Sequence, residues 1–531
     1  MMNTLHIITT LVFICYSGYA VSQTYVWAKG EGGIGNDVAN SVTVDEQGNT
    51  YVAGNLAGMA EVSGTQVQGM GLYDVLLVKY GPQGQVVWIR TAGDDRNQQA
   101  NAIKYKDGFI YVAGIFEDTC FFDQQYVVSQ GEADVFIAKY DVAGNLIWVK
   151  SAGGPQTDHL SGIDVDNGGN VYVCGYYETT ALFDTVTVTT TNFFAESFLA
   201  SYRSDGSFRW VRSSAGTYSN QFTSLAVDPA GYVYFTGFFG STYKLGGTTL
   251  NAVSSSLDIL IGKTDTTGAL IWLKRAGGTY EDAANAICTD NSGDIYIAGY
   301  FGGTATFGNN TVTYLNYNDV FVAKYNPQGD NLWVRTGRGQ ELEMAYAVAC
   351  DKAGNVYATG LYQDQAEFSG VSVTGNFRDI FIVSYNTNGD LRWLSTAGGG
   401  NTDCAVSIAL RDNDNVVISG YYLYTCTLGS ISLPYSDATD WLVAEFSPPF
   451  LSGTHAMPEE SIFLYPNPAG SEVMLPIPEQ TPVYIYNTGG MLMTTLHVTG
   501  KKLLLNNLAP GVYVLQFEAD GELQHKKLIR Y

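Results

Sequence analysis

Short apolar runs alternate with Gly- and Asn-containing turns along most of the chain. One module shows the pattern clearly: an apolar run over 319–325, a turn over 326–330 and a second run that carries Trp333. Short runs rich in β-branched and aromatic residues, joined by such a turn, predict a β-hairpin. No long stretch shows the 3.6-residue period of an amphipathic helix, so we predict an all-β fold.

The apolar run recurs at a fixed interval. Two further strand signals precede each copy, as at 285–290 and 296–299, so each repeat carries four strands. A period of this length predicts a repeat architecture. Seven copies, about 61 residues apart, begin at Asp74, Asp134, Glu196, Asp258, Asp319, Asp379 and Asp440.

The phase of the Trp-bearing strands distinguishes a ring from a linear array. The Trp-bearing strand occurs seven times, at Trp27, Trp88, Trp148, Trp210, Trp272, Trp333 and Trp393. Trp27 precedes every other repeat element, and no Trp strand follows the run at Asp440. A linear array gains nothing from this offset, whereas in a ring the first strand completes the last sheet and leaves no open edge. We therefore predict a seven-bladed β-propeller of four-stranded blades over residues 23–447, closed by the N-terminal strand.

One column of the first strand supports radial packing, because every member is small. Innermost propeller strands crowd around the axis, where large side chains would clash. The Trp residues fall on the strand predicted to be outermost, where the blades splay. The column consists of Ser41, Ala102, Gly162, Ser224, Ala286, Ala347 and Ser407.

The repeat carries a family resemblance. The run Val-Asp-x-x-Gly-Asn-x-Tyr-Val-x-Gly from Val44, followed by Asp-x-Phe-Val-x-Lys-Tyr from Asp319 and a Trp, resembles the SBBP (seven-bladed β-propeller) repeat of bacterial exported proteins. The resemblance covers roughly residues 25–447. It implies a fold and not an activity.

A second module follows a Pro- and Gly-containing linker over 448–460 and occupies 461–531. It resembles the type A C-terminal sorting domain of the type IX secretion system. That resemblance implies a small Ig-like β-sandwich, recognition by the secretion machinery and removal by its sortase-like peptidase, with attachment to cell-surface lipopolysaccharide in many members. The matching positions are Pro466, Asn467, Pro468, Gly489, Gly490, Gly511, Val512, Tyr513, Lys526 and Lys527.

Residues 1–22 are interpreted as a signal peptide, because a short apolar run precedes small residues around Ala20. No other segment is predicted to span a membrane. The net charge of −24 argues against nucleic-acid binding and against attraction to anionic membranes. These features predict a protein that is secreted or held on the outside of the cell.

Six Cys follow the signal peptide, and an even count in an exported chain invites disulfides. Several lie on predicted strands, where a buried thiol behaves as a small hydrophobe, so we favour free core thiols. Cys404 and Cys426 share a repeat and are the first pair to check for a disulfide.

The inventory of catalytic residues is thin. Of five His, only His159 lies in the propeller region, so a multi-His metal site is not expected there. Asp-rich turns such as 166–170 lack the distal Glu of a calcium loop, and their Asp and Asn side chains are more typical of turn capping. We expect no catalytic residue, no resident metal and no cofactor, with a calcium ion as the one alternative.

One polar column is the candidate site. Its members lie five residues before the apolar position of each first strand, at corresponding points around one mouth of the predicted channel. Converging carboxylates can hold a cation, a glycan or a cationic ligand, with His159 beside them. The alternative is that each member caps the turn into the next blade. The column consists of Asp37, Gln98, Asp158, Asn220, Asp282, Glu343 and Asp403.

Aromatic residues in the longer loops offer a second candidate surface. Phe122, Phe183, Phe307 and Phe368 recur at one position per repeat, which indicates packing. Tyr176, Tyr177, Phe238 and Phe239 are additional aromatics, expected to be exposed and able to contact sugars or proteins.

Three hypotheses of function follow. The first is a non-enzymatic binding or scaffolding propeller with a glycan or protein ligand. The second is a polysaccharide lyase or hydrolase acting at the channel mouth, although nothing selects the asymmetric carboxyl pair that glycoside cleavage needs. The third is a purely structural adhesin or matrix component.

Overall fold

The structure is a computed structural model that describes residues 24–190, 193–254, 256–411, 414–448, 471–475, 481–487, 492–506, 508–519 and 522–530. The predicted signal peptide, nearly all of the linker, and Pro466, Asn467, Pro468, Gly489 and Gly490 lie outside these residues. The chain divides into two compact domains, Met1–Pro449 and Phe450–Tyr531, and each is described by itself.

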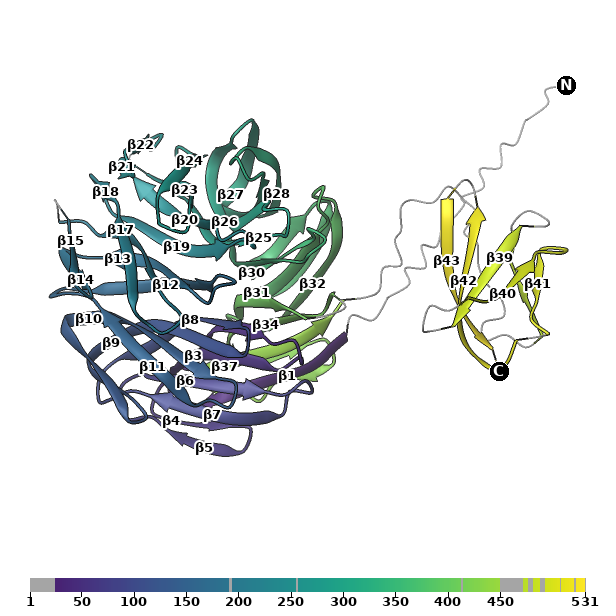
Figure 1. Ribbon diagram of the computed structural model, residues 1–531, viewed down its shortest axis with the longest axis horizontal. Helices are drawn as coiled ribbons and strands as arrows, with labels where there is room; N and C mark the ends of the chain where they lie inside the picture. The colour runs from purple at the N-terminus through teal and green to yellow at the C-terminus, as the bar shows by residue number, and fades with distance from the viewer. Residues whose placement is uncertain are drawn as a thin grey trace, which may run out of the picture. The chain divides into compact units, whose positions relative to one another are not determined.

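The regular elements of the described residues are β-strands, so the all-β prediction is confirmed. Among these residues there is no helix long and apolar enough to cross a bilayer. In the larger domain the antiparallel strands form groups of four (Figure 1), and pairing at the strand ends joins some groups into larger sheets. We call these groups units and number them 1 to 7 in chain order.

The first three sheets follow the chain. Unit 1 contains β2 (Val38–Val44), β3 (Thr50–Leu56), β6 (Asp74–Tyr80) and β7 (Val86–Ala92). Unit 2 contains β8 (Gln98–Lys106), β9 (Phe109–Phe122), β10 (Gln125–Asp141) and β11 (Leu146–Ala152). Unit 3 contains β12 (Asp158–Val165), β13 (Val171–Tyr177), β16 (Glu196–Tyr202) and β17 (Phe208–Ser213).

The next three repeat this order. Unit 4 contains β19 (Asn220–Val227), β20 (Val233–Gly240), β23 (Leu257–Thr264) and β24 (Leu270–Gly278). Unit 5 contains β25 (Asp282–Thr289), β26 (Ile295–Phe307), β27 (Asn310–Tyr325) and β28 (Asn331–Gly339). Unit 6 contains β29 (Glu343–Cys350), β30 (Val356–Phe368), β31 (Val371–Tyr385) and β32 (Leu391–Gly399).

Unit 7 takes strands from both ends of the propeller region. It contains β33 (Cys404–Leu410), β34 (Val416–Tyr424), β37 (Ser436–Ser447) and, as its outer strand, β1 (Thr24–Gly33). β1 pairs antiparallel with β37, from Thr24 opposite Ser447 to Glu31 opposite Trp441. The first strands pack side by side in chain order, and β33 packs against β2.

Hairpins extend the units at the connection between second and third strands. In some units the extension continues the two strands, and in others it is a separate pair. The separate hairpin strands are β4 (Met59–Val62), β5 (Thr65–Gln68), β14 (Thr180–Phe183), β15 (Val186–Thr189), β21 (Thr242–Leu245), β22 (Thr248–Asn251), β35 (Cys426–Leu428) and β36 (Ile431–Ser432). The short strand β18 (Ala215–Gly216) follows the outer strand β17 and pairs with β21. The end of each outer strand bridges to the hairpin of the following unit, as Gly277 pairs with Thr306.

Each first strand carries a β-bulge just before the small residue of the inner column, such as the register shift between Ala100 and Ala102. Polar bulge residues bond the neighbouring first strand: Asn101 Nδ2 donates to the Leu160 carbonyl over 2.8 Å. At the seam between units 7 and 1, the Val42 amide donates to Ser407 Oγ over 3.2 Å. The hydrophobic clusters lie between adjacent units, as where Val443 of unit 7 packs with Val52 of unit 1.

The Trp of one unit and the turn Gly of the next are partners. An added Cβ on Gly329 would lie 3.2 Å from the Trp272 ring, and φ of 79° at Gly329 favours glycine there. Trp272 Nε1 donates to the Pro327 carbonyl of the same turn over 3.1 Å. The Trp and the turn Gly therefore recur together in the repeat, because the ring of one unit packs against the turn of the next unit where that Gly lies.

The smaller domain forms two sheets around one core. β38 (Glu472–Met474) pairs with β41 (Lys502–Leu504), and the second sheet has the order β40 (Leu492–His497), β39 (Pro482–Asn487), β42 (Gly511–Ala519), β43 (Glu522–Arg530). Buried Val473, Ile485, Leu503, Leu515 and Leu528 belong to its core. Gly511, Val512 and Tyr513 begin β42, and Lys526 and Lys527 lie on β43 beside it.

Candidate functional site

The seven residues of the candidate column lie at equivalent positions, at or one residue before the start of each first strand. All seven are buried, with at most 1 % of the side chain exposed. Each faces an acidic residue on the third strand of the preceding unit. The pairs are Asp37 with Asp440, Gln98 with Asp74, Asp158 with Asp134, Asn220 with Glu196, Asp282 with Asp258, Glu343 with Asp319, and Asp403 with Asp379. We call these the junction pairs.

The junction pairs accept main-chain hydrogen bonds where strands end. Asp282 accepts from the amides of Gly278 and Gly302, over 2.6 and 3.1 Å. Asp134, the third-strand partner of Asp158, accepts from the amides of Gln130 over 2.8 Å and of Gly154 over 3.1 Å. Buried amides need such acceptors, so this geometry favours the turn-capping interpretation of the column.

Glycines in the connecting segment make room for the carboxyl groups. A Cβ added to Gly153 would collide with Asp134 and lie 2.8 Å from Asp158 Oδ2. The same holds at Gly277, where Asp282 Oδ2 and Asp258 Oδ1 lie 2.8 and 3.2 Å from the added Cβ. The two carboxyl groups of a junction therefore pack directly against the backbone that joins their units, where a side chain larger than that of Gly would collide with them.

Burial and mutual repulsion raise the carboxyl pKa values. Burial raises the pKa of Asp158 to about 8, with a further contribution from the charge of Asp134. Burial likewise raises the pKa of Glu343 and of Asp403 to about 8, each beside an acidic neighbour. Their partners are less affected, since burial raises the pKa of Asp134 to about 6. Near neutral pH such a pair holds one proton between two carboxyl groups.

The Asn220 junction shows what the shared proton replaces. Asn220 Nδ2 donates to Glu196 Oε2 over 2.7 Å, and Ser214 Oγ donates to the same oxygen over 2.7 Å. In the carboxyl–carboxyl junctions, oxygens such as Asp158 Oδ2 and Asp403 Oδ2 are buried without a partner among the described residues. A carboxyl O–H can fill this place, as the amide N–H does at Asn220.

The buried pairs leave no exposed carboxylate for a solute at these positions. Within the described part of the chain, no group of three or more His, Cys, Asp or Glu side chains is arranged to hold a metal ion. His159 stacks on Tyr176, with ring centroids 5.1 Å apart, and its ring Nε2 lies 3.3 Å from Asn101 Nδ2. Burial lowers the His159 pKa, which keeps the ring neutral near pH 7.

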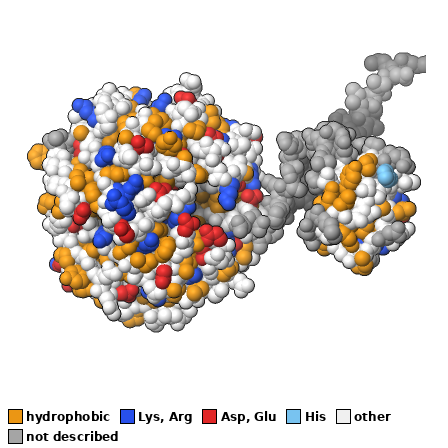
Figure 2. Space-filling model, in the orientation of Figure 1, with side chains coloured by type: hydrophobic (Ala, Val, Ile, Leu, Met, Phe, Trp, Pro, Cys, Tyr) orange, Lys and Arg blue, Asp and Glu red, His pale blue; other side chains and the backbone are white. Residues whose placement is uncertain are grey.

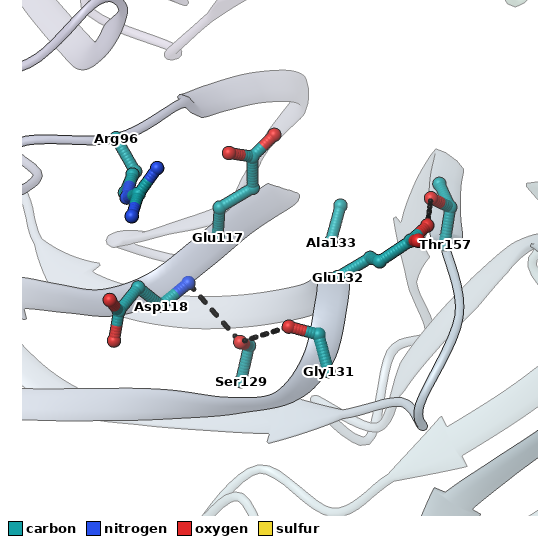
Figure 3. A pocket seen from close by; sticks show the side chains of 8 residues that line it. All are labelled: Arg96, Glu117, Asp118, Ser129, Gly131, Glu132, Ala133 and Thr157. Carbon is teal, nitrogen blue, oxygen red and sulfur yellow. Dashed lines mark hydrogen bonds between the residues drawn. The ribbon is translucent and has the colours of Figure 1, made fainter.

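A polar pocket lies between the unit 2 hairpin and the connection to unit 3. Its volume is about 540 Å³, and Figure 3 shows Arg96, Glu117, Asp118 and Glu132 around it. Glu117 accepts from Asn97 and Glu132 accepts from Thr157, each over 2.9 Å. No repeated motif pointed to this pocket.

A larger pocket, about 830 Å³, lies at the turns between first and second strands of units 1, 6 and 7. Arg411 stands here where unit 1 has the turn residue Asp45. Its guanidinium bonds Glu445 over 2.5 Å and the Pro82 carbonyl over 3.1 Å. The repeat symmetry therefore breaks at the seam between units 7 and 1.

Exposed apolar side chains gather at the opposite end of the units. In an antiparallel four-stranded unit, the connection between second and third strands leaves from the same end as the connection to the next unit. We call this the loop end. Its exposed residues are Ile34, Met70, Leu72, Phe193, Tyr218, Tyr280, Leu315, Tyr317, Phe377 and Tyr435. Figure 2 shows hydrophobic, acidic and basic side chains interspersed over the face in view.

The predicted aromatic candidates are only partly exposed. Tyr177 and Phe239 are fully buried, so the expectation that they are exposed was wrong. They alternate along β13 and β20 with Tyr176 and Phe238, which are half-buried, because successive side chains of a strand point to opposite faces. Phe122, Phe183, Phe307 and Phe368 are buried, in agreement with a packing role.

Residues 463–530 match the family of secretion system C-terminal sorting domains, which indicates export. The chain is 24 % identical over 358 residues to an uncharacterised WD repeat-containing protein of Acanthamoeba polyphaga mimivirus, covering 54 % of this chain and 26 % of that protein. The chain thus spans about a quarter of that relative's length.

Solved β-propellers are also similar to this chain. The WD40 β-propeller domain of Doa1 aligns with a TM-score of 0.40 at 12 % identity, over 80 % of this chain and 96 % of that one. Sqt1 from Chaetomium thermophilum aligns with a TM-score of 0.32 at 10 % identity, over 78 % of this chain and 88 % of that one.

Proposed function

We propose that the protein is an exported, non-enzymatic binding protein built on a closed seven-bladed propeller of SBBP repeats. The antiparallel pairing of β1 with β37 and the packing of β33 against β2 support the closure. The two small sheets around one core support an Ig-like sandwich for the tail, which the type IX machinery and its sortase-like peptidase recognise. Delivery is to the cell surface, with attachment to lipopolysaccharide, or to the medium.

The contrast between buried acids and exposed aromatics carries the proposal. The junction pairs are sealed inside the fold, whereas the loop end exposes Tyr280 by 58 % and Tyr317 by 64 %. Aromatic side chains supply large contact area at low entropy cost and are enriched where proteins bind partners. Propeller loops vary while the sheets stay regular, so the loop end is where a ligand site is expected. The ligand is a glycan or a protein surface with apolar faces.

A binding comparison on the full chain tests this. The wild type is screened against arrays of polysaccharides and of surface proteins, and the hit is measured again with Tyr280→Ser and Tyr317→Asn. Asn suits the position because φ at Tyr317 is 48°. The matched controls are Val87→Ser and Ile271→Ser, which change exposed apolar residues on outer strands. We expect at least a tenfold weaker affinity for the loop-end variants only.

Two outcomes would overturn the proposal. One is equal loss of affinity in the loop-end variants and the outer-strand controls. The other is turnover of a polysaccharide by the wild type, which would make the protein an enzyme.

A further inference from the structure

Two of the six cysteines of the propeller region differ from the other four. Cys120, Cys174, Cys404 and Cys426 are at most 1 % exposed, whereas Cys288 and Cys350 are partly exposed. Cys288 lies on β25 and Cys350 on β29, the packed first strands of units 5 and 6. Both pack against the same hydrophobic cluster.

The two thiols are also in direct contact. Cys350 is a side-chain hydrogen-bond partner of Cys288. Cys404 and Cys426 share a unit, yet the groups that influence the Cys404 thiol are Tyr421, Asp403 and Arg378 and not Cys426. Contact between the thiols and partial exposure of the two residues therefore coincide at Cys288 and Cys350.

We propose that Cys288 and Cys350 form a disulfide that links units 5 and 6 in the exported protein. The sorting domain sends the chain to an exterior where disulfides persist. A disulfide here covalently joins two neighbouring first strands, which hydrogen bonds and packing alone hold otherwise. The segment it closes spans one whole repeat, so the link restricts the unfolded chain.

The reaction is two thiol–disulfide exchanges with a disulfide donor, either a small molecule or an oxidoreductase. One Cys loses its proton, and its thiolate attacks the donor disulfide, releasing one donor thiol and leaving a mixed disulfide. The second thiolate attacks the protein sulfur of that mixed disulfide and releases the second donor thiol. Two electrons pass to the donor. Burial raises the pKa of the Cys288 thiol, and the positive charge of Lys104 opposes part of that rise.

Peptide mapping of the full chain tests the pairing without depending on export. The purified protein is incubated with oxidised glutathione, denatured in acid, alkylated and digested with trypsin. We expect peptide 276–324, which holds Cys288, to be linked to peptide 339–352, which holds Cys350. Reduction should separate them. Recovery of both as alkylated peptides, or linkage to any other Cys peptide, would overturn the proposal.

Matched variants connect the bond to stability. We expect dithiothreitol to lower the melting temperature of the oxidised wild type and to leave Cys288→Ala and Cys350→Ala unchanged. Cys404→Ala, which removes a buried thiol elsewhere, should respond to dithiothreitol as the wild type does. If Cys288→Ala fails to fold, Cys350→Ser provides the same comparison. A wild type that is insensitive to dithiothreitol after oxidation would contradict the proposal.

Discussion

Trp27 Nε1 donates a hydrogen bond to Glu445 Oε2 over 2.7 Å, across 418 residues of chain. In units 1 to 5 the Trp donates to a main-chain carbonyl in a turn of the next unit, as Trp210 does to Thr266. At the seam, Arg411 takes the equivalent carbonyl of Pro82, and Glu445 receives both Arg411 and Trp27. A buried ion pair thus replaces a turn contact at the place where the two ends of the propeller region meet.

Removing Glu445 should weaken this seam more than any exposed acid would. Glu445 is 3 % exposed, and its loss leaves the Arg411 charge and the Trp27 N–H buried without their acceptor. We expect Glu445→Ala to lower the free energy of unfolding by about 3–5 kcal/mol, measured by urea denaturation. The double variant Arg411→Met with Glu445→Met should be less destabilised than Glu445→Ala. The control is Glu61→Ala, which loses only an exposed hydrogen bond to Gln66; an equal effect there would refute the prediction.

Two tryptophans separate the hydrogen bond from the packing of the ring. Trp333 and Trp393 are 7 % and 6 % exposed. Trp333 Nε1 donates to the Thr387 carbonyl over 3.1 Å, whereas Trp393 Nε1 is buried without a partner among the described residues. Phe retains most of the ring area in both. We expect Trp393→Phe to cost about 1–3 kcal/mol less than Trp333→Phe in chemical denaturation, because only the latter breaks a bond. Equal costs would contradict this account.

The strand pattern was readable from the sequence because hydrophobic periodicity and turn residues act locally. The position of Trp27 ahead of the repeats indicated where its strand belongs. Its partner Glu445 was not predictable, since a single Glu in a buried strand has no sequence signal for its acceptor role. Spacing in the sequence shows that a residue recurs in each repeat. It does not show which side chain of another strand that residue contacts, because the packing of the strands decides this.

The junction pairs show the same limit. The column with Asp158 was visible as a repeat, and so was the acid that opens each apolar run, such as Asp134. That the two face one another depends on the outer strand, which carries the chain from one to the other. Their burial was unexpected, because Asp is rarely buried unless it is paired. The amide–acid junctions, Asn220 with Glu196 and Gln98 with Asp74, would have hinted at pairing, since an amide can donate to an acid.

Stability should fall as pH rises from about 4 to 8. The ordinary pKa of Asp is 3.8, and in the folded chain the pKa of Asp158 is about 8. In this window the folded state binds more protons than the unfolded state, so the free energy of unfolding decreases with pH. The slope is about 1.4 kcal/mol per pH unit for each proton held. Melting temperature measured in a pH series should be higher at pH 5 than at pH 8. A flat or rising profile would contradict the shared proton.

An amide in place of one carboxyl should remove part of this dependence. Asp158→Asn reproduces the chemistry of Asn220, whose amide donates to Glu196. We expect the variant to be more stable than the wild type at pH 8, with a shallower slope of melting temperature against pH. Asp123→Asn changes an exposed residue in the turn between β9 and β10 and should leave the slope unaltered. A slope unchanged in Asp158→Asn would place the titrating groups elsewhere.

The inner column should tolerate no large side chain. A Cβ added to Gly162 would lie 3.1 Å from Cys174 Sγ and 3.3 Å from the backbone of Leu225 in the next unit. We expect Gly162→Val to destabilise the fold by about 1–3 kcal/mol in urea denaturation, because overpacking forces both first strands apart. Gly400→Val is the matched control, since nothing lies within 4 Å of its added Cβ. Equal stability of the two variants would argue against close packing of the first strands.

Export should depend on the tail while folding of the propeller region should not. The two compact domains have separate cores, and the sorting-domain match lies wholly within the smaller domain. We expect a chain that ends at residue 448 to have the same melting temperature as the larger domain in the full chain. We also expect this truncated chain to stay inside the producing cell. Tyr513→Ala offers a gentler comparison, because Tyr513 is 7 % exposed and its hydroxyl donates to the Ala509 carbonyl over 2.8 Å. Fractionation followed by immunoblotting should show less of this variant outside the cell. Full recovery of the truncated chain from the medium would show that the tail does not direct export.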